Sequence, residues 1–457
     1  MPSSTRASAL RWLLISLLLA VSATTVVACG GDDTSTADSD GELAGTVEFW
    51  WWGEEEAPGF KKWIKSTAAA FEKENPDVDV ELVEQTTNNL VQASQAAQAA
   101  QKGPDIQFYW PVGFFQEDMF NGNLAPLDEL LSDEQLASFP AAARDYASWE
   151  GSVYGAPMYS IGNPWVYRKD LFEKAGLDPE QPPETFDELL DAGEKLNAAG
   201  ITPFAAGMKD QWYADWPWML YQACGVEDAG EWFDAFLGER SLEEPEFLQT
   251  WEKIAATREA GMYADNLFDL ALYEGFDQLL EGNAAIGTPV APTGVDWERK
   301  LGSDKLGAFL TPCQDESPLA KRYPNAWHYV GIPAFSDQQE EAAAFIAFMH
   351  EPKQGAALYR EAGAMMGNDR LDIEPDGEVS RQMIDWAEDS YFALYYTSPP
   401  TVDEWIWPNV GKLLAGDMTP EEAAEVSEEA NARWLKNNRR IADNFGEWRD
   451  QVTGSSE

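Results

Sequence analysis

Apolar positions along the chain follow two spacings, and each spacing predicts a different element. Residues 46–50, TVEFW, have the pattern of a buried strand, and residues 78–83, VDVELV, alternate between apolar and acidic side chains as a half-buried strand does. Between them, apolar residues from Phe60 to Phe71 recur at helical spacing, and residues 103–110 give a further strand that opens on a Gly-Pro turn. Short strands that alternate with amphipathic helices predict an α/β fold.

Four positions carry the capping-box pattern, in which a serine or threonine precedes a glutamate or glutamine by three residues. These predicted helix starts are Ser132, Thr185, Ser336 and Thr419, the last followed by a proline at the first helical position. Residues 342–349 add an apolar stripe at helical spacing. We interpret these features as structural, without chemistry of their own.

Residues 1–28 have the organisation of a secretory signal. Arg6 and Arg11 lie in a basic start, an apolar stretch follows over residues 12–28, and small residues end it before Cys29. Residues 26–29, VVAC, resemble the bacterial lipobox, in which the cysteine is lipidated and begins the mature chain. An ordinary signal peptide or a transmembrane anchor is the alternative, and the small residues before the cysteine favour lipidation.

Residues 29–45 predict a flexible tether, because they are rich in glycine, serine, threonine and aspartate and have little to bury. No second long apolar run follows this segment. We therefore expect an extracytoplasmic protein that is anchored to the cell membrane only by the lipid on Cys29.

Length and charge narrow the class of protein. A chain of 457 residues is too long for a single core, so two domains are expected. The net charge of −49 argues against a nucleic-acid partner, whose phosphates would be repelled, and no basic run is present to hold a phosphorylated ligand. With two histidines and no CxxC motif, we expect no metal site and no other cofactor.

Two cysteines remain beyond Cys29. Outside the cell, Cys224 and Cys313 are free to pair, since secretion permits disulfides. The sequence alone does not say whether their Cα atoms come within bridging distance. A disulfide and two free thiols therefore both stay open.

Seven segments, in order, resemble the extracellular solute-binding proteins of bacterial ABC importers, specifically the large carbohydrate-binding, maltose-binding-protein-like family. The segments are GTVEFWWWGEEE with FEKENPDVDVELVE, then KGPDIQFYW, GNLAPLDELL, VYGAPMYSIGNPWVYRKDLFEKAGL, LLEGNAAIG, AWHYVGIPAFSDQQEEAAAFIAFM and AGDMTPEEAAEVSEEANARW. Any one segment is weak, but seven in order behind a lipobox cover nearly the whole mature chain.

The resemblance implies a two-lobe, periplasmic-binding-protein-like α/β fold with crossing hinge strands and an interlobe cleft. Lobe one would comprise residues 45–161 and 327–375, and lobe two residues 162–326 and 376–450. In this family the ligand sits in the cleft and the lobes close on it by hinge motion.

A carbohydrate cleft needs aromatic rings beside carboxylates and amides. A pyranose has apolar C–H faces that an indole covers, and a rim of hydroxyls that carboxylates and amides hydrogen-bond. Several segments offer that combination at strand ends or in loops, among them WWWGEEE at 50–56, KDQWYADWPW at 209–218 and TVDEWIWPNV at 401–410. The candidate ligand-binding residues are Trp51, Trp52, Glu54, Tyr109, Trp110, Asn163, Trp165, Asp210, Trp212, Asp215, Trp216, Trp327, Glu404, Trp405 and Trp407.

Each candidate also has a structural alternative. Adjacent side chains of a strand point to opposite faces, so the three tryptophans at 50–52 cannot all be core, and we assign Trp50 to the core and leave Trp51 and Trp52 open. Of Trp405 and Trp407, one is expected to face sugar and the other protein. For His328 we expect a buried, hydrogen-bonded ring.

These features predict a lipid-anchored binding protein, monomeric and not an enzyme, that captures a carbohydrate, of oligosaccharide size, and delivers it to ABC permease subunits. One alternative is a surface glycoside hydrolase, which also needs tryptophans and paired carboxylates. The chain has no G-x-S-x-G, Walker A or GxGxxG motif to suggest other chemistry. The other alternative keeps the fold but binds a cation such as a polyamine, because aromatic boxes with carboxylates also suit cations.

Overall fold

The first strand of the chain lies inside a five-stranded sheet. The computed structural model describes residues 43–111, 113–392 and 402–454. In it the strand order is β2(Val78–Glu84), β1(Gly45–Trp51), β3(Ile106–Tyr109), β12(Trp327–Gly331) and β6(Ala156–Ser160). Strand β1 is parallel to β2 and β3, and β12 is antiparallel to both β3 and β6. The start of β12 therefore lies at the same edge as the carboxyl ends of β1 and β3.

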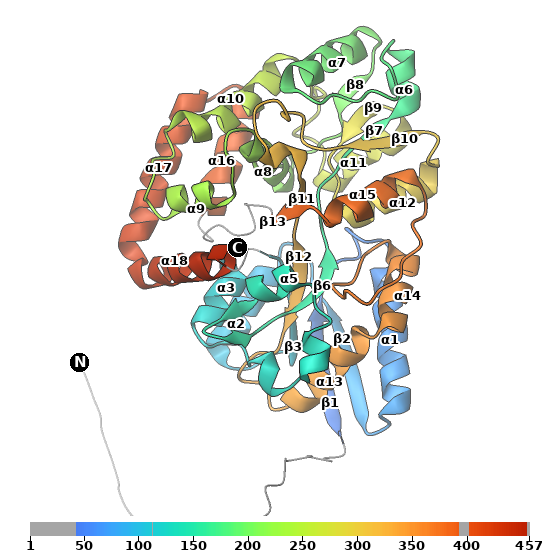
Figure 1. Ribbon diagram of the computed structural model, residues 1–457, viewed down its shortest axis with the longest axis vertical. Coiled ribbons are helices and arrows are strands. Elements are labelled where there is room, and N and C mark those ends of the chain that lie inside the picture. The colour runs from blue at the N-terminus through green and yellow to red at the C-terminus, as the bar shows by residue number, and fades with distance from the viewer. Residues whose placement is uncertain (1–42, 112, 393–401, 455–457) are drawn as a thin grey trace, which may run out of the picture. The chain divides into compact units, whose positions relative to one another are not determined.

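Helices α1(Phe60–Glu74), α13(Gln339–Met349) and α14(Pro352–Ala362) pack beside this sheet (Figure 1). The apolar stripe of α1 is buried, as its spacing predicts, and Phe71 meets Phe345 of α13 with ring centroids 5.1 Å apart. Helices that are far apart in the sequence thus build one core.

A second, four-stranded sheet forms from the middle of the chain. Its order is β10(Leu306–Phe309), β7(Trp165–Arg168), β9(Ala284–Gly287) and β8(Thr202–Phe204). Strands β8 and β9 are parallel, whereas β7 is antiparallel to both β9 and β10. The carboxyl ends of β8 and β9 consequently share one edge.

The remaining elements are helices, 3-10 helices (η) and short strands. They are α2(Leu90–Ala100), α3(Gly113–Phe120), η1(Leu127–Glu129), α4(Asp133–Leu136), α5(Ala141–Tyr146), β4(Ser148–Trp149), β5(Ser152–Val153), α6(Lys169–Lys174), α7(Phe186–Ala198), η2(Trp212–Ala214), α8(Asp215–Tyr221), η3(Gln222–Cys224), α9(Gly230–Phe236), α10(Pro245–Glu259), α11(Leu272–Glu281), α12(Ala291–Leu301), η4(Leu319–Lys321), β11(Tyr323–Asn325), α15(Glu378–Ala387), β13(Ser390–Phe392), α16(Val402–Ala415), α17(Pro420–Asn437) and α18(Arg439–Gly454).

The chain passes between the two sheets more than once, and the crossing segments lie side by side. The Ile161 N–H donates to the Ala326 carbonyl at 2.9 Å, which joins the β6–β7 crossing to the β11–β12 crossing. The Ser160 N–H donates to the Met365 carbonyl at 2.9 Å, which adds the segment after α14. The predicted two-lobe α/β fold with crossing strands is confirmed, and we call the unit around the first sheet lobe one and that around the second lobe two.

The predicted residue ranges of the lobes stay a prediction. Residues 376–450 were assigned to lobe two, and α18 contacts both lobes, because it packs against α3 and α5 of lobe one and against α9 and α17 of lobe two. Its Trp448 is fully buried there and donates from Nε1 to the Tyr146 carbonyl at 3.1 Å. The signal peptide at 1–28, Cys29 and most of the tether at 29–45 lie outside the described residues.

Three of the four predicted capping boxes form. Ser132, Thr185 and Thr419 each accept from the N–H three residues on, while the glutamine or glutamate there accepts from the cap N–H. The prediction at Ser336 is wrong, because its hydroxyl donates to Asp105 at 2.6 Å and the helix begins at Gln339 instead. The hydroxyl also accepts from the Gln338 N–H at 3.0 Å, so it closes a short turn before the helix instead of capping it.

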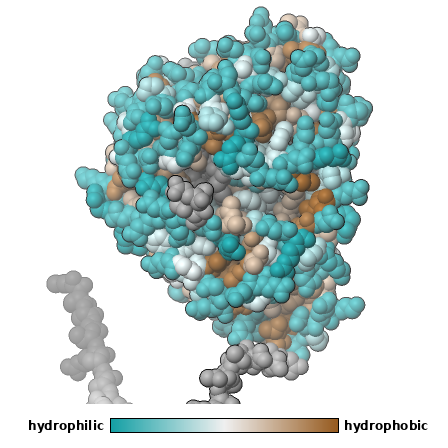
Figure 2. Space-filling model, in the orientation of Figure 1, coloured by the Kyte–Doolittle hydropathy of each residue, from teal (hydrophilic) through white to brown (hydrophobic). Residues whose placement is uncertain are grey.

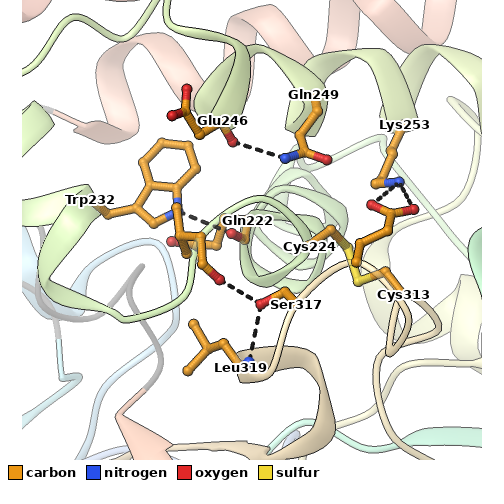
Figure 3. Close-up of a disulfide and its surroundings, with 11 residues drawn as sticks. Gln222, Cys224, Trp232, Glu246, Gln249, Lys253, Cys313, Ser317 and Leu319 are labelled. Atoms are coloured by element: carbon orange, nitrogen blue, oxygen red, sulfur yellow. Dashed lines mark hydrogen bonds and ion pairs between the residues drawn. A yellow bond between two sulfur atoms is a disulfide. The ribbon is translucent and has the colours of Figure 1, made fainter.

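Cys224 and Cys313 form a disulfide, with Cα atoms 5.5 Å apart, which decides the pairing that the sequence left open (Figure 3). Cys224 ends η3, directly after α8, and Cys313 follows β10. Nearby, Lys253 and Glu316 make an ion pair at 2.9 Å. The disulfide therefore ties α8 to the segment that leaves the second sheet.

The surface is mostly hydrophilic on the one face that Figure 2 shows. On the face drawn in Figure 2, hydrophilic residues cover most of the surface and hydrophobic residues form small separate patches. Within the described part of the chain, no helix is both long and apolar enough to cross a membrane.

Candidate ligand-binding site

A cavity of about 400 Å³ lies between the two lobes, within the usual size range for small-molecule sites. Both lobes contribute to its wall, which combines aromatic rings with acidic side chains. The lining residues are Trp52, Glu55, Glu56, Thr87, Asn88, Trp110, Ile161, Asp210, Trp212, Asp215, Trp216, Ala271, Leu272, Tyr273, Glu274, Val290 and His328.

Lobe one brings its part of the wall together at one edge of the first sheet. Trp52 follows β1 and Trp110 follows β3, so the parallel strands deliver both indoles to the same edge. His328 comes from the start of β12, which enters that edge antiparallel. Gly53 turns the chain with φ of 133°, a conformation that favours glycine, and a Cβ there would lie 2.8 Å from the Tyr159 hydroxyl.

Lobe two repeats this arrangement at the edge of the second sheet. Asp210 and Trp212 follow β8, Val290 follows β9, and Asp215 and Trp216 begin α8. The first turn of α11 adds Tyr273 and Glu274, and the Leu272 N–H donates to Asp210 at 3.2 Å. The loop after β8 and the start of α11 are thereby held against each other.

A chain of indoles in edge-to-face contact crosses from lobe one to lobe two. Ring centroids are 5.3 Å apart for Trp52 and Trp110, 5.5 Å for Trp110 and Trp212, and 4.7 Å for Trp212 and Trp407. The Trp407 Nε1 donates to the Asp215 carboxylate, which fixes the lobe-two end of this row of indoles. Such pairs fix ring orientation, which a site for flat apolar ligand faces needs.

Polar bonds hold the lobe-one rings in place. The Trp52 Nε1 donates to the Thr87 hydroxyl at 2.9 Å, and that hydroxyl donates to Glu55 at 3.1 Å. At the floor, Nε2 of His328 lies 2.9 Å from the Glu56 carboxylate, and both side chains are buried. Burial, with Glu56 nearby, raises the pKa of the Tyr159 hydroxyl well above its ordinary value of 10, so this phenol stays neutral.

Contacts between the lobes also pass behind the cavity wall. The Thr293 hydroxyl of α12 donates to the Glu56 carbonyl at 2.8 Å. The Asn163 amide, oriented so that both of its ends find partners, donates to the Ile161 carbonyl at 3.2 Å and accepts from the Trp216 Nε1 at 3.3 Å. The crossing segment thus positions one of the cavity's indoles.

Six of the fifteen predicted ligand-binding residues line the cavity. They are Trp52, Trp110, Asp210, Trp212, Asp215 and Trp216. Two more lie directly behind it, since Trp407 packs on Trp212 and Asn163 bonds Trp216. Their contact with a ligand stays a prediction.

Four candidate residues are core residues and do not line the cavity, which corrects Tyr109 and Trp165, decides Trp51 and makes Trp405 the protein-facing member of its pair. Trp51 packs on Phe60, and Tyr109 donates from its hydroxyl to Asp118 at 2.9 Å. Trp165 packs within 5.6 Å of Phe309 in the second sheet. Trp405 is buried by lobe-two tryptophans, while its neighbour Trp407 reaches the cavity wall's rear. All four side chains are at most 3% exposed.

Three further candidates lie elsewhere. Glu54 accepts from the N–H groups of Gly59 and Lys61, so it serves the start of α1 instead of the cavity. Trp327 is half-buried against the aromatic cluster around Tyr329 and does not line the cavity. The side chain of Glu404 lies outside the described residues.

Several lining residues are not among the predicted ones. Glu55 and Glu56 directly follow the predicted tryptophans, so the loop after β1 was the available signal. His328 is buried and hydrogen-bonded as predicted, and it also lines the cavity. Tyr273 and Glu274 carry no local signal, because only the tertiary fold brings α11 to this wall. Among the described residues, no cluster of histidine, cysteine and acidic side chains is arranged to hold a metal ion.

Comparison with known sequences gives one family. Residues 53–356 match the family described as bacterial extracellular solute-binding protein. The sn-glycerol-3-phosphate-binding periplasmic protein of Salmonella paratyphi A is 32% identical over 413 residues, which cover 86% of this chain and 92% of that protein. An uncharacterised ABC transporter extracellular-binding protein of Pyrococcus horikoshii is 28% identical over 41% of this chain, and the match spans only 43% of that relative's length.

Solved structures share the fold. A structure from work on xylan utilisation by Caldanaerobius polysaccharolyticus superposes with a TM-score of 0.73 at 23% identity, over 84% of this chain and 99% of the other. A solute-binding protein in complex with raffinose superposes with a TM-score of 0.71 at 19% identity, over 85% and 98% of the two chains. At these identities the likeness shows the two-lobe fold alone.

Proposed function

The chain belongs to the bacterial extracellular solute-binding protein family, and from that premise we propose that it captures a carbohydrate in the cavity between its lobes and delivers it to an ABC permease. In this proposal the lipid on Cys29 anchors a monomer to the outside of the cell membrane. The residues up to 45 act as the tether, and hinge closure about the crossing segments traps the ligand.

One observation carries the proposal: indoles from both lobes bound the same cavity, beside carboxylates. Trp52 and Trp110 come from lobe one, and Trp212 and Trp216 come from lobe two. A pyranose between them would cover apolar ring faces with its C–H faces while its hydroxyls donate to the carboxylates. The solved neighbours named for xylan utilisation and raffinose support a saccharide ligand.

The cavity argues against the ligand of the sn-glycerol-3-phosphate-binding relative. A phosphate is normally held by arginine, lysine or a helix N-terminus. The lining residues include five carboxylates, and no lysine or arginine is among them. The first turns of α8 and α11 also reach the wall, but they carry the carboxylates of Asp215 and Glu274, which would repel a phosphate. We therefore propose a ligand without a phosphate group.

A thermal-shift screen of mono- and oligosaccharides tests the proposal, because a ligand that binds only the folded protein raises its melting temperature. We expect at least one saccharide to raise it, and sn-glycerol-3-phosphate to have no effect. A panel in which no saccharide shifts the transition, or in which the phosphate ester alone does, would contradict the proposal.

A protein that only binds its sugar should leave that sugar uncleaved. After incubation of an oligosaccharide hit with stoichiometric protein, we expect the sugar to be recovered intact. Release of shorter products would favour a surface glycoside hydrolase, for which paired carboxylates in the cavity would supply acid and nucleophile.

A further inference from the structure

The cavity wall carries an excess of negative charge. Its five carboxylates are Glu55, Glu56, Asp210, Asp215 and Glu274, and His328 is the only basic side chain beside them among the described lining residues. A neutral sugar needs acceptors for its hydroxyls, but it does not need this charge.

Most of these carboxylates have neutral partners. Glu55 accepts from the Thr87 hydroxyl at 3.1 Å, and Glu274 accepts from the Ala271 N–H at 2.9 Å. Asp210 accepts from the N–H groups of Trp212 at 3.3 Å and Leu272 at 3.2 Å. Within the described ranges, none of Glu55, Asp210 and Glu274 makes an ion pair with a lysine or arginine.

Glu55, Asp210 and Glu274 are exposed in this structure, and closure of the lobes around a ligand would make their charge costly. Removing water from carboxylates that share a cavity raises their free energy unless a counter-charge replaces the water. A neutral ligand would leave that penalty standing, whereas a cationic group on the ligand would offset it. Tryptophan faces also attract cations, so the four cavity indoles favour the same kind of group.

A buried histidine lies beside these carboxylates. His328 is 2% exposed, its Nε2 faces the Glu56 carboxylate, and its Nδ1 has no partner among the described residues. A carboxylate oxygen accepts, so Nε2 is the donor of this pair. The carboxylates of the wall accept hydrogen bonds, which suits an ammonium group with its three N–H donors.

We propose that the ligand of this cavity is a carbohydrate that carries a protonated amine, an amino sugar or a saccharide that contains one. The inference rests on the proposed function, since it takes the ligand to be a saccharide, and it adds the charge. The indoles would cover the sugar's C–H faces, and Glu55, Asp210 and Glu274 would surround the ammonium group.

Calorimetric titration of the mature chain with matched saccharides tests this inference. Each set shares one skeleton and differs in one substituent, amine, N-acetylamine or hydroxyl, as in glucosamine, N-acetylglucosamine and glucose, the corresponding galactose set, and the β-1,4-linked disaccharides of the glucose set. Spermidine is included as a cation without a sugar ring.

We expect at least one amine member to bind ten-fold or more tightly than both its N-acetyl and its hydroxyl counterparts at pH 6. The preference should shrink with added salt, which screens charge, and with a rise in pH that deprotonates the amine. Glu274→Gln should reduce the preference several-fold. Asp277→Asn is the matched control, because Asp277 is an exposed carboxylate of the same helix that does not line the cavity.

The other outcomes separate the two proposals. Neutral sugars that bind as tightly as their amine counterparts would overturn this inference and leave the carbohydrate function standing. Spermidine binding without any saccharide binding would overturn both. Absence of binding throughout, or an unchanged preference in Glu274→Gln, would also overturn the amino-sugar assignment.

Discussion

The indole of Trp110 meets the indole of Trp212 edge to face, with ring centroids 5.5 Å apart and planes at 74°. Trp110 follows β3 of lobe one, and Trp212 follows β8 of lobe two. The two residues are far apart in sequence and follow strands of different sheets, so this contact joins the two lobes at the cavity wall. Any change in the angle between the lobes must alter it.

The half-buried cavity indoles should carry much of the binding free energy. We expect Trp212→Ala and Trp216→Ala each to weaken saccharide binding by about 1–3 kcal/mol, because aromatic anchors at the centre of a site dominate affinity. Titration calorimetry measures the change, and circular dichroism checks the fold.

Trp386→Ala is the matched control for these variants. Trp386, on α15, is also half-buried, but it packs on Tyr323 and does not line the cavity. Equal losses in all three variants, or no loss in Trp212→Ala and Trp216→Ala, would show that the cavity indoles are not the contact surface.

Asn163 should act through Trp216. Its amide joins the Ile161 carbonyl to the Trp216 Nε1, and loss of such a hydrogen bond costs roughly 0.5–1.5 kcal/mol. We expect Asn163→Ala to weaken binding by about that amount in wild-type background and by much less in Trp216→Ala. A double-mutant cycle measures this coupling, and additive losses would refute the link between the two residues.

The disulfide should stabilise lobe two. Removal of a native disulfide typically costs roughly 2–5 kcal/mol, and the bond between Cys224 and Cys313 closes a long loop with a sequence separation of 89. We expect the Cys224→Ser, Cys313→Ser double variant to melt several degrees lower than wild type, and a reductant to lower the wild-type melting temperature only. A melting temperature that the double substitution leaves unchanged would contradict this prediction.

His350 should lower the free energy of unfolding at mildly acidic pH. Burial lowers the pKa of this ring from its ordinary value of 6.5, although its two nitrogens face the Ile346 and Pro157 carbonyls. Below about pH 6.5 the unfolded chain therefore takes up a proton that the folded protein does not, and this group's contribution to the free energy of unfolding falls as the pH falls.

Urea unfolding at pH 7.5 and pH 5.5 checks the His350 prediction. When the pH falls from 7.5 to 5.5, we expect the free energy of unfolding to fall further, or rise less, in wild type than in His350→Gln. Carboxyl groups such as Asp118, whose pKa burial raises, contribute with the opposite sign in both proteins and cancel in the comparison. Parallel pH profiles would exclude a role for His350.

The sequence predicted the parts of this structure that local patterns determine. Strand alternation and helical stripes predicted the elements, but the assignment of Trp50 to the core is wrong, because Trp50 is only half-buried. Trp51 is the buried one, since it shares a face with buried Val47 and Phe49 and the strand continues to residue 51. Trp52 lies beyond the strand's end and is released from that alternation. On α16, Trp405 and Trp407 lie two residues apart and so point to different sides of the helix, one into the core and one towards the cavity wall.

Other features depend on contacts that no local pattern encodes. The start of α11 is held at the cavity by bonds to the loop after β8, where Asp210 accepts from the Leu272 N–H and the Lys209 N–H donates to the Leu270 carbonyl. Ser336 has a capping-box sequence, yet its hydroxyl bonds Asp105, more than two hundred residues earlier. The pairing of His328 with Glu56 likewise joins the start of β12 to the loop after β1, two strands that the folded sheet places on either side of β3.

The crystal structure of this protein with the tightest-binding saccharide of the screen tests the central claim most directly. We expect one sugar molecule in the cavity, with a C–H face against Trp212 or Trp216 and contacts to both lobes. Density for the sugar at any other surface, with the cavity closed and its four indoles covered by protein alone, would contradict the account.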